Sequence, residues 1–353
     1  MAAEPQTRLA YVDSMRLVAA ALVFAQHLFE ARPGFGKTYL IPLAPGVAGV
    51  ALFFFISGFV IPMAARGGLD IRQFMIRRFF RIYPLYLAAL AVIVAAAVSG
   101  LLPQLDVIVK SAAFVWAANL LLVAEYVGVL PFIGVAWTLS VELIWYAMFA
   151  VFVLMFGKRA ADRLDVLMPA SLIMLTIASL AIGERLPLGR PTMIYAAVIG
   201  FQCYRFQFGE IDAARLRLSI VVFAIVGLVS NYVAFGYFQH PNLTMLQAIG
   251  PWVTATVVFL IWTLYRPLRE VRLLNRGWMP VLGAMSYSIY MLHTFATSIA
   301  FTHFPPELQV LVACVLTLAL AWAGYTFVEK PGIALGRRLS RRSVALPGET
   351  RTA

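Results

Sequence analysis

Two ionisable residues near the start of the chain, Arg16 and His27, are spaced so that one helix would present both on the same face. They are eleven positions apart, which places them about three turns and about 16 Å apart along a helix axis. Asp13, three residues before Arg16, can pair with its guanidinium. A neutral imidazole at His27 is suited to remove a proton from a hydroxyl. The plainer alternative is that Arg16 only snorkels towards water and His27 only forms a hydrogen bond.

Arg77, Arg78 and Arg81 stand together at the start of an apolar segment. On a helix, Arg81 lies within one turn of each of the other two. Guanidinium groups donate in a planar fork that matches phosphate oxygens, so this run predicts a site for a phosphate-bearing molecule. A basic loop that orients the chain in a membrane and touches lipid phosphates would also explain the run.

Two further segments place polar groups inside apolar stretches. Glu142, in a segment that begins at Trp137, is a carboxylate that is costly in a membrane unless it is paired or protonated. It is a candidate to orient a histidine or a sugar hydroxyl, or else a structural partner for a buried cation. Ser57 is a buried hydroxyl beside Gly58, which allows another helix to approach closely. Helix packing is the plainer interpretation there.

Near the C-terminal end, Ser286, Tyr290 and His293 follow an i, i+4, i+7 pattern and share one helix face. A polar face inside a membrane helix points to the interior of the bundle, where it either lines a wet cavity or joins helices together. The segment from Glu329 to Pro331 is interpreted as an anchor at the cytoplasmic interface. The two cysteines have no neighbouring ligands, and no metal site is predicted.

The elements that must position these residues are membrane helices. Of the 353 residues, 62% are apolar and only 12% are charged, whereas a soluble domain carries about 25% charged residues. Apolar runs of membrane length recur throughout the chain. They lie at 9–29, 45–64, 82–101, 107–128, 134–156, 166–182, 192–207, 218–236, 244–265, 281–302 and 309–328. The chain is therefore predicted to be an all-α integral membrane protein.

The distribution of Lys and Arg among the loops helps to decide how many of these runs span the membrane. If 107–128 is re-entrant or interfacial and both termini are cytoplasmic, most of the 28 Lys and Arg residues fall on the cytoplasmic side. This arrangement predicts ten spans. A non-spanning segment at membrane depth must be buried in protein or line a cavity, so 107–128 is a candidate wall for a site.

The same charge pattern bounds domains and partners. Residues 1–331 are predicted to form one membrane-embedded domain, and 332–353 a basic cytoplasmic tail that is disordered. The net charge of +12 reflects orientation and contact with membrane lipids rather than nucleic-acid binding, because the basic residues lie between apolar segments. A homo-oligomer stays open.

Taken together, these segments resemble the bacterial acyltransferase-3 family of membrane-bound O-acyltransferases. The resemblance covers about 13–331. The matching segments are Asp13 with Arg16 through His27, Phe54 to Phe59, Arg81 to Pro84 preceded by Arg78, Trp137 to Glu142, Ser286 to His293, and Glu329 to Pro331. Many relatives carry a fused extracytoplasmic hydrolase-like domain, and this chain is expected to be a member without one.

The resemblance implies a multi-pass enzyme of the bacterial cytoplasmic (inner) membrane. It would transfer an acyl group, most often acetyl, from cytoplasmic acyl-CoA to a hydroxyl of a carbohydrate-type acceptor such as a surface polysaccharide, lipopolysaccharide or lipo-oligosaccharide sugar. Acetyl-CoA or another acyl-CoA would be a co-substrate, with no tightly bound cofactor.

Roles follow from this combination. Arg77, Arg78, Arg81 and Arg16 are expected to bind the CoA phosphates, and His27 to act as general base or to carry the acyl group itself. Glu142 or Asp13 would set the state of His27. With His27, Arg16 and Glu142 are expected to be catalytic. The candidates for contact with the acceptor or with a developing oxyanion are Asp13, Ser57, Trp137, Tyr290 and His293. The competing class is a multi-pass transporter or a flippase of lipid-linked sugars, which would have no need of a thioester site.

Overall fold

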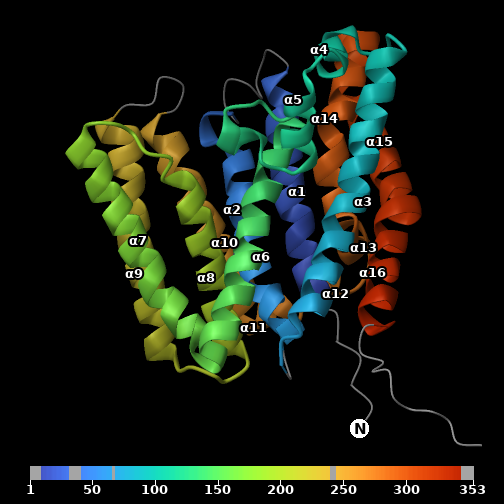
Figure 1. The fold of residues 1–353 in the computed structure, drawn as a ribbon. Coiled ribbons are helices and arrows are strands. Elements are labelled where there is room, and N and C mark those ends of the chain that lie inside the picture. The colour runs from blue at the N-terminus through green and yellow to red at the C-terminus, as the bar shows by residue number, and fades with distance from the viewer. Residues whose placement is uncertain (1–8, 32–40, 66–67, 239–243, 343–353) are drawn as a thin grey trace, which may run out of the picture. The chain divides into compact units, whose positions relative to one another are not determined.

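The structure, a computed structural model, describes residues 9–31, 41–65, 68–238 and 244–342. Within these ranges every regular element is a helix and no strand occurs (Figure 1). This confirms the predicted all-α class. The physical reason is that apolar segments in lipid have no water for their backbone groups, and a helix satisfies those groups internally.

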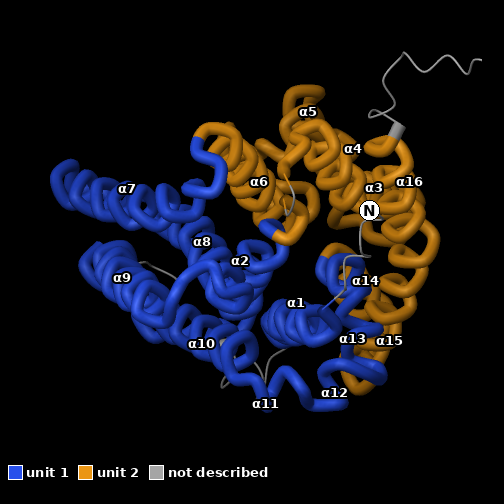
Figure 2. The backbone as a smooth tube through the Cα atoms, turned by 90° about the horizontal axis from the view of Figure 1, so that it is seen from below, with its two compact units in different colours: residues 1–62, 156–290 blue, residues 63–155, 291–353 orange. Residues whose placement is uncertain are grey.

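The chain divides into two compact units, each assembled from two stretches of sequence (Figure 2). Unit 1 comprises Met1–Pro62 and Phe156–Tyr290, and unit 2 comprises Met63–Met155 and Met291–Ala353. The sequence predicts one membrane-embedded domain over 1–331, whereas the structure resolves two units within that range. Hydropathy alone does not distinguish them, because both units are built from the same kind of apolar helix.

Unit 1 is organised around α2 (Pro45–Val60). This helix packs on α1 (Ala10–Glu30), α8 (Gly189–Gln207) and α10 (Met245–Leu264). The other elements of unit 1 are α7 (Ala160–Ile182), α9 (Ala213–Asn231), a π-helical turn at Tyr232–Tyr237, and the short helices α11 (Arg266–Arg269), α12 (Arg272–Asn275) and α13 (Trp278–Ala284).

Two glycines bring α2 and α8 into backbone contact. A Cβ atom added at Gly58 would lie 1.7 Å from the carbonyl oxygen of Ala197, and one added at Gly200 would lie 2.1 Å from that of Phe55. Neither position has room for any side chain. Small residues let membrane helices approach closely, so this contact bears out the helix-packing interpretation of Gly58.

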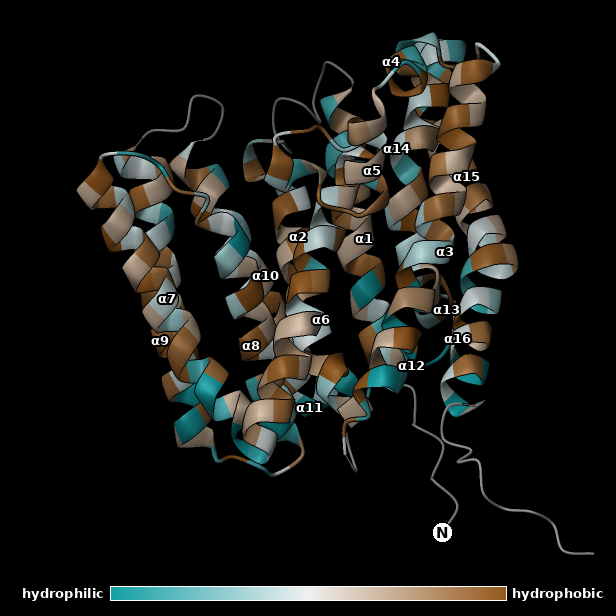
Figure 3. Ribbon diagram, in the orientation of Figure 1, coloured by the Kyte–Doolittle hydropathy of each residue, from teal (hydrophilic) through white to brown (hydrophobic). Residues whose placement is uncertain are grey.

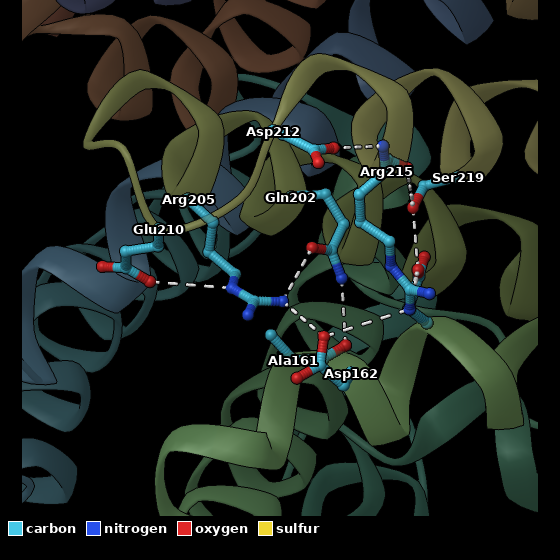
Figure 4. A network of polar contacts seen from close by, with 9 residues as sticks. Ala161, Asp162, Gln202, Arg205, Glu210, Asp212, Arg215 and Ser219 are labelled. Atoms are coloured by element: carbon cyan, nitrogen blue, oxygen red, sulfur yellow. Dashed lines mark hydrogen bonds and ion pairs between the residues drawn. The ribbon is translucent and has the colours of Figure 1, made fainter.

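Acidic and basic side chains join α7, α8 and α9 at one end of these helices (Figure 4). Arg205 on α8 donates to Asp162 at 2.8 Å and to Gln202 at 3.1 Å. Arg215 on α9 donates to Asp165 at 3.0 Å. The α7–α9 network is defined here as Asp162, Asp165, Gln202, Arg205, Glu210, Arg215 and Ser219. It fastens three helices together where they leave their apolar parts.

Unit 2 is organised along α3 (Ile71–Val98), against which α16 (Lys330–Arg342) packs. The helix α14 (Ser286–His303) begins in unit 1 and continues in unit 2 after Tyr290. The other elements of unit 2 are α4 (Asp106–Val109), α5 (Ala113–Leu120), a 3-10 turn η5 (Ala124–Val127), α6 (Trp137–Phe156), α15 (Pro306–Gly324) and a π-helical turn η9 (Tyr325–Glu329).

Seven helical stretches of the described chain are long and apolar enough to cross a membrane. They are Ala10–Glu30, Pro45–Ala65, Ile71–Val98, Gly134–Ile182, Ala213–Tyr237, Met245–Leu264 and Pro306–Arg341. The protein is accordingly a multi-helix membrane protein. Colouring by hydropathy shows α7 and α9 as mainly apolar along their length, with hydrophilic residues gathered at one end (Figure 3).

The predicted spans all coincide with helices, although the count of ten stays a prediction. Gly134–Ile182 contains two of them, α6 and α7. At 1.5 Å per residue its 49 residues would measure about 74 Å, more than twice the hydrocarbon core of a bilayer. The helices α8 and α14 match predicted spans but are not among the seven.

The segment 107–128 consists of short pieces. The longest, α5, has 8 residues, well under the roughly 20 that a span needs. The segment packs against α3 of the same unit: the Tyr86 hydroxyl donates to the backbone carbonyl of Asn119 at 2.8 Å. Whether the segment is re-entrant or interfacial stays a prediction.

The predicted disorder of the tail is wrong for residues 332–342. These residues belong to α16, whose buried glycines face α3: Gly332 lies against Pro84, and Gly336 against Phe80. Small residues at intervals of four give this basic helix a packing face, which composition alone does not reveal. Residues 343–353 lie outside the described part of the chain.

Candidate active site

The helix α1 carries His27 in a defined ring state. The Nδ1 atom lies 3.1 Å from the carbonyl oxygen of Val23, one turn earlier in the helix. A carbonyl can only accept a hydrogen bond, so in the neutral ring Nδ1 carries the proton and Nε2 the lone pair. The side chain is half-buried.

Asp13 and Arg16 form the predicted pair one turn inside the same helix. Arg16 Nη1 lies 3.2 Å from Asp13 Oδ1, with Asp13 buried and Arg16 partly exposed. Because α1 is continuous from Ala10 to Glu30, Arg16 and His27 do share a face, about 16 Å apart.

Contacts within unit 1 hold this end of α1 in place. A Cβ atom added at Gly283 of α13 would lie 1.8 Å from the carbonyl oxygen of Asp13. The hydroxyl of Ser14 donates to the carbonyl of Leu274 at 2.9 Å. The ion pair between Asp13 and Arg16 is therefore mounted on a fixed backbone rather than on a fraying helix end.

The three arginines of α3 have separate environments. The Arg78 guanidinium lies over the rings of Phe74 at 5.2 Å and Tyr146 at 5.4 Å. Its Nε is buried, and among the described residues it has no hydrogen-bond acceptor. Aromatic faces stabilise a cation without consuming its donors, so the Nε–H of Arg78 stays available as a hydrogen-bond donor.

Tyr146 connects Arg78 to Glu142. Its hydroxyl donates a short hydrogen bond to Glu142 Oε1, one turn away on α6. Tyr146 is the tenth of the 20 residues of α6, so the Arg78 guanidinium lies level with the middle of that helix. The sequence analysis missed Tyr146. Its position four residues after Glu142 is the signal that could have identified it.

Arg81 is committed to a carboxylate. Its Nη1 lies 2.5 Å from Glu329 Oε1, and the Glu329 side chain is fully buried while Arg81 is partly exposed. The interpretation of Glu329 as an interface anchor is therefore wrong. It is an internal counter-ion in the π-helical turn between α15 and α16.

Arg77, one turn before Arg81, contacts α16. Its Nε donates to the hydroxyl of Ser340 at 3.0 Å, and its Nη2 donates to Gln73 at 3.0 Å. The run of arginines that the sequence treats as one cluster thus divides among three partners: rings, a carboxylate and a hydroxyl.

Trp137 lines a small pocket in unit 2. Its walls also include Asn119, Leu122 and Glu125, so the segment 107–128 does form the wall of a pocket. The hydroxyl of Ser140 donates to the carbonyl of Leu122 at 2.5 Å and ties the segment to α6.

The remaining candidates differ in accessibility. Ser57 Oγ on α2 is buried, without a hydrogen-bond partner among the described residues. Tyr290 on α14 packs edge-on against Phe53 of α2, with ring centroids 5.6 Å apart. His293 has no exposed surface. The fully enclosed His293 is better placed for packing than for meeting an acceptor.

The candidates divide between the units. Unit 1 holds Asp13, Arg16, His27, Ser57 and Tyr290, and unit 2 holds Arg77, Arg78, Arg81, Trp137, Glu142 and His293. One set supplies a base and a paired cation, and the other supplies arginines and a carboxylate. Together they are the groups expected of a membrane enzyme that activates a hydroxyl and binds an anionic donor.

Comparison with known proteins gives the family. A model of the acyltransferase domain matches residues 9–326, nearly the whole chain, so the protein belongs to this acyltransferase family and is an enzyme that transfers acyl groups. The resemblance drawn from the motifs is thereby confirmed.

The chain is similar in sequence to three named bacterial proteins. The exopolysaccharide production protein ExoZ of Rhizobium meliloti is 28% identical over 77% of this chain and 82% of its own length. The acyltransferase MdmB of Streptomyces mycarofaciens is 30% identical over 44% of this chain and 42% of its own length. Nodulation protein 10 of Rhizobium leguminosarum bv. viciae is 30% identical over 38% and 41%. No solved structure matches the chain.

Proposed function

We propose that the protein is an O-acyltransferase of the bacterial inner membrane. It transfers an acyl group, most readily acetyl, from cytoplasmic acyl-CoA to a hydroxyl of a carbohydrate-type acceptor. The name of the relative from Rhizobium meliloti, an exopolysaccharide production protein similar over most of both chains, supports a polysaccharide-type acceptor. The seven apolar helical stretches support a membrane location.

The observation that carries the proposed chemistry is the ring state of His27. Because Nδ1 meets the carbonyl of Val23, the lone pair belongs to Nε2, the nitrogen at the outer end of the ring. Nε2 removes the proton of the acceptor hydroxyl while that oxygen attacks the thioester carbon. The tetrahedral intermediate then expels the CoA thiolate, which takes the proton back from the imidazolium.

The donor is proposed to bind through α3. Arg78 keeps a buried N–H beside the ring of Tyr146, which suits it to donate to an oxygen of the pantetheine arm. Arg77 lies on another face of the helix and is assigned to phosphate. Arg81 serves mainly to neutralise Glu329. Glu142 acts through Tyr146, which keeps the face of its ring under the Arg78 cation.

Negative charge on the tetrahedral intermediate requires a donor. Ser57 is the candidate that this geometry favours, because its buried hydroxyl has no acceptor among the described residues. Tyr290 is the second candidate. A route through an acyl-His27 intermediate uses the same nitrogen as nucleophile, and it predicts CoA release before the acceptor is added.

The test is CoA release by the purified protein in lipid vesicles, supplied with acetyl-CoA and a bacterial polysaccharide mixture. His27→Ala is expected to lower the rate by about 10²- to 10⁴-fold, the usual contribution of a general base. His303→Gln, a histidine on the exposed end of α14, is the matched control and should retain full activity.

Each outcome has a meaning. Full activity in His27→Ala would remove that residue from the mechanism. Absence of both turnover and saturable CoA binding in the wild type would overturn the acyl-CoA donor and favour a transporter. Binding of CoA without release would mean that the acceptor mixture lacks the natural substrate.

A further inference from the structure

The helix α16 is held against α3 in a fixed register. Gly332, Gly336 and Ser340 follow each other at intervals of four and form its buried face. Gly332 and Gly336 meet Pro84 and Phe80, and Ser340 accepts the hydrogen bond of Arg77. The last turns of α16 therefore lie beside the first turns of α3.

This register gathers guanidinium groups. Arg337 and Arg341 lie on either side of Ser340 in sequence, one turn apart on α16, and both are exposed. Because Ser340 accepts the hydrogen bond of Arg77, both arginines flank the Arg77 guanidinium, where their positive charges repel it. The α3–α16 basic cluster is defined as Arg77, Arg337 and Arg341.

Among the described residues, Asp70 is the acidic group that acts on Arg77. The Asp70 side chain is also engaged as the N-cap of α3, accepting the backbone N–H of Gln73 at 3.0 Å. Three like charges held together by a packed helix interface repel one another, and an anion would relieve that repulsion.

The cluster lies beyond the apolar part of its helices. The helical stretch Pro306–Arg341 has 36 residues and measures about 54 Å, against about 30 Å for a hydrocarbon core and about 40–45 Å for a whole bilayer. Its basic end therefore projects out of the hydrocarbon. A water-soluble anion can reach Arg341 there without entering lipid.

We propose that the α3–α16 basic cluster binds the 3′-phosphate of the acyl-CoA donor, an inference that rests on the proposed function. This phosphate is a monoester that carries nearly two negative charges, and guanidinium groups bind its oxygens in forked pairs. The neighbouring Arg78, about 100° around the same helix, would then lie next to the pantetheine arm.

A lipid phosphate fits this cluster less well. The exposed apolar residues of α16, Leu335 and Leu339, lie about 120–160° around the helix from Arg337 and Arg341. An acyl chain packed along those leucines would hold its headgroup away from the cluster. CoA has no such requirement, because its adenosine end is polar throughout.

The test compares CoA with 3′-dephospho-CoA. Dissociation constants are measured for the full-length protein in phosphatidylcholine nanodiscs, for the wild type and for Arg337→Ala/Arg341→Ala. The wild type is expected to bind CoA about 10-fold or more tightly than dephospho-CoA. The double variant should lose that preference by weakening CoA alone, while dephospho-CoA binds as before.

Two control variants distinguish an effect of the cluster from an effect of the net charge of α16. Arg338→Ala removes the same charge from the same helix but points about 100° away from Arg337, and it should keep the preference. Arg337→Lys/Arg341→Lys should restore part of it, which a folding defect would not allow.

Several results would overturn the inference. An unchanged preference in the double variant would remove the cluster from CoA binding. If that variant instead loses retention of phosphatidylglycerol in mixed nanodiscs, the ligand is a lipid. Equal wild-type affinity for the two CoA forms would exclude a 3′-phosphate site and leave the donor assignment intact, whereas no affinity for either would overturn the proposed function itself.

Discussion

The arginines of the α7–α9 network in unit 1 and those of the α3–α16 basic cluster in unit 2 differ in the charge of their neighbouring side chains. In the network, Arg205 lies within ion-pair distance of Asp162 and Glu210, and Arg215 within that of Asp162 and Asp165. In the cluster, the arginines come from two packed helices, and the hydroxyl of Ser340 accepts a hydrogen bond from Arg77. Both groups lie at the ends of apolar helices.

The difference separates structural charge from charge available to a ligand. An arginine that is matched with carboxylates holds helices together and gains little from a further anion. An arginine that lies next to other arginines is destabilised by their repulsion, and a bound anion would reduce that repulsion. A related contrast occurs within α3, where Arg81 is paired with Glu329 and Arg78 lies over two aromatic rings.

The largest effect is expected at the pair between Arg81 and Glu329. Arg81→Ala would leave a fully buried carboxylate without its counter-ion, at a cost of about 3–5 kcal/mol in the free energy of unfolding. Thermal unfolding in detergent measures it. Arg81→Ala/Glu329→Leu, which removes both charges, should recover most of the loss, and an equally unstable double variant would contradict this account.

A smaller loss is expected in the α7–α9 network. Arg205→Ala removes one partner of Asp162 and Glu210, but both carboxylates are close to half-exposed, so water replaces part of the interaction. We expect about 1–2 kcal/mol of destabilisation. The CoA affinity of the folded fraction should be unchanged, and a loss of CoA affinity would assign the network to ligand binding.

Arg77→Ala should produce the reverse pattern. The variant removes one of three repelling charges together with the hydrogen bonds that Arg77 donates to the neutral groups of Ser340 and Gln73, so stability should change by less than about 1 kcal/mol. The dissociation constant for CoA should rise about 10-fold. Equilibrium binding and a melting curve on the same preparation give both numbers, and strong destabilisation would make Arg77 a structural residue.

The smallest effect is a response to salt. Raising ionic strength from about 0.05 to 0.5 M shortens the screening length to a few ångströms and weakens repulsion within the cluster. The melting temperature of the ligand-free protein should rise slightly. The rise should be smaller in Arg337→Ala/Arg341→Ala, and an identical salt response in both proteins would place the repulsion elsewhere.

Much of the helical framework could be predicted from the sequence, because it depends on local pattern. The apolar runs assigned to spans are helical, although the run 281–302 is divided between α13 and α14. The spacing of Arg16 and His27 directly gives their common face on α1. The family also follows from motifs that are local and ordered along the chain. These features need no knowledge of which helices touch.

The partners of the key side chains could not be predicted, because they are distant in sequence. Glu329 meets Arg81 across 248 positions, and Ser340 meets Arg77 across 263. Local patterns in a single sequence do not indicate which distant residues will be in contact. A basic segment such as 332–342 accordingly resembles a tail until its glycines are seen to face another helix.

The backbone contact between α2 and α8 bears on how the protein is made. Gly200 follows Gly58 by about 140 positions, and the intervening chain includes most of the first part of unit 2. At about 5–20 residues per second, the ribosome delivers α8 roughly 7–28 s after α2. During that interval α2 has left the ribosome without the neighbour that its bare glycine surface requires. Biogenesis of unit 1 therefore includes a waiting period, in which a membrane insertase or the lipid itself must cover the first two helices.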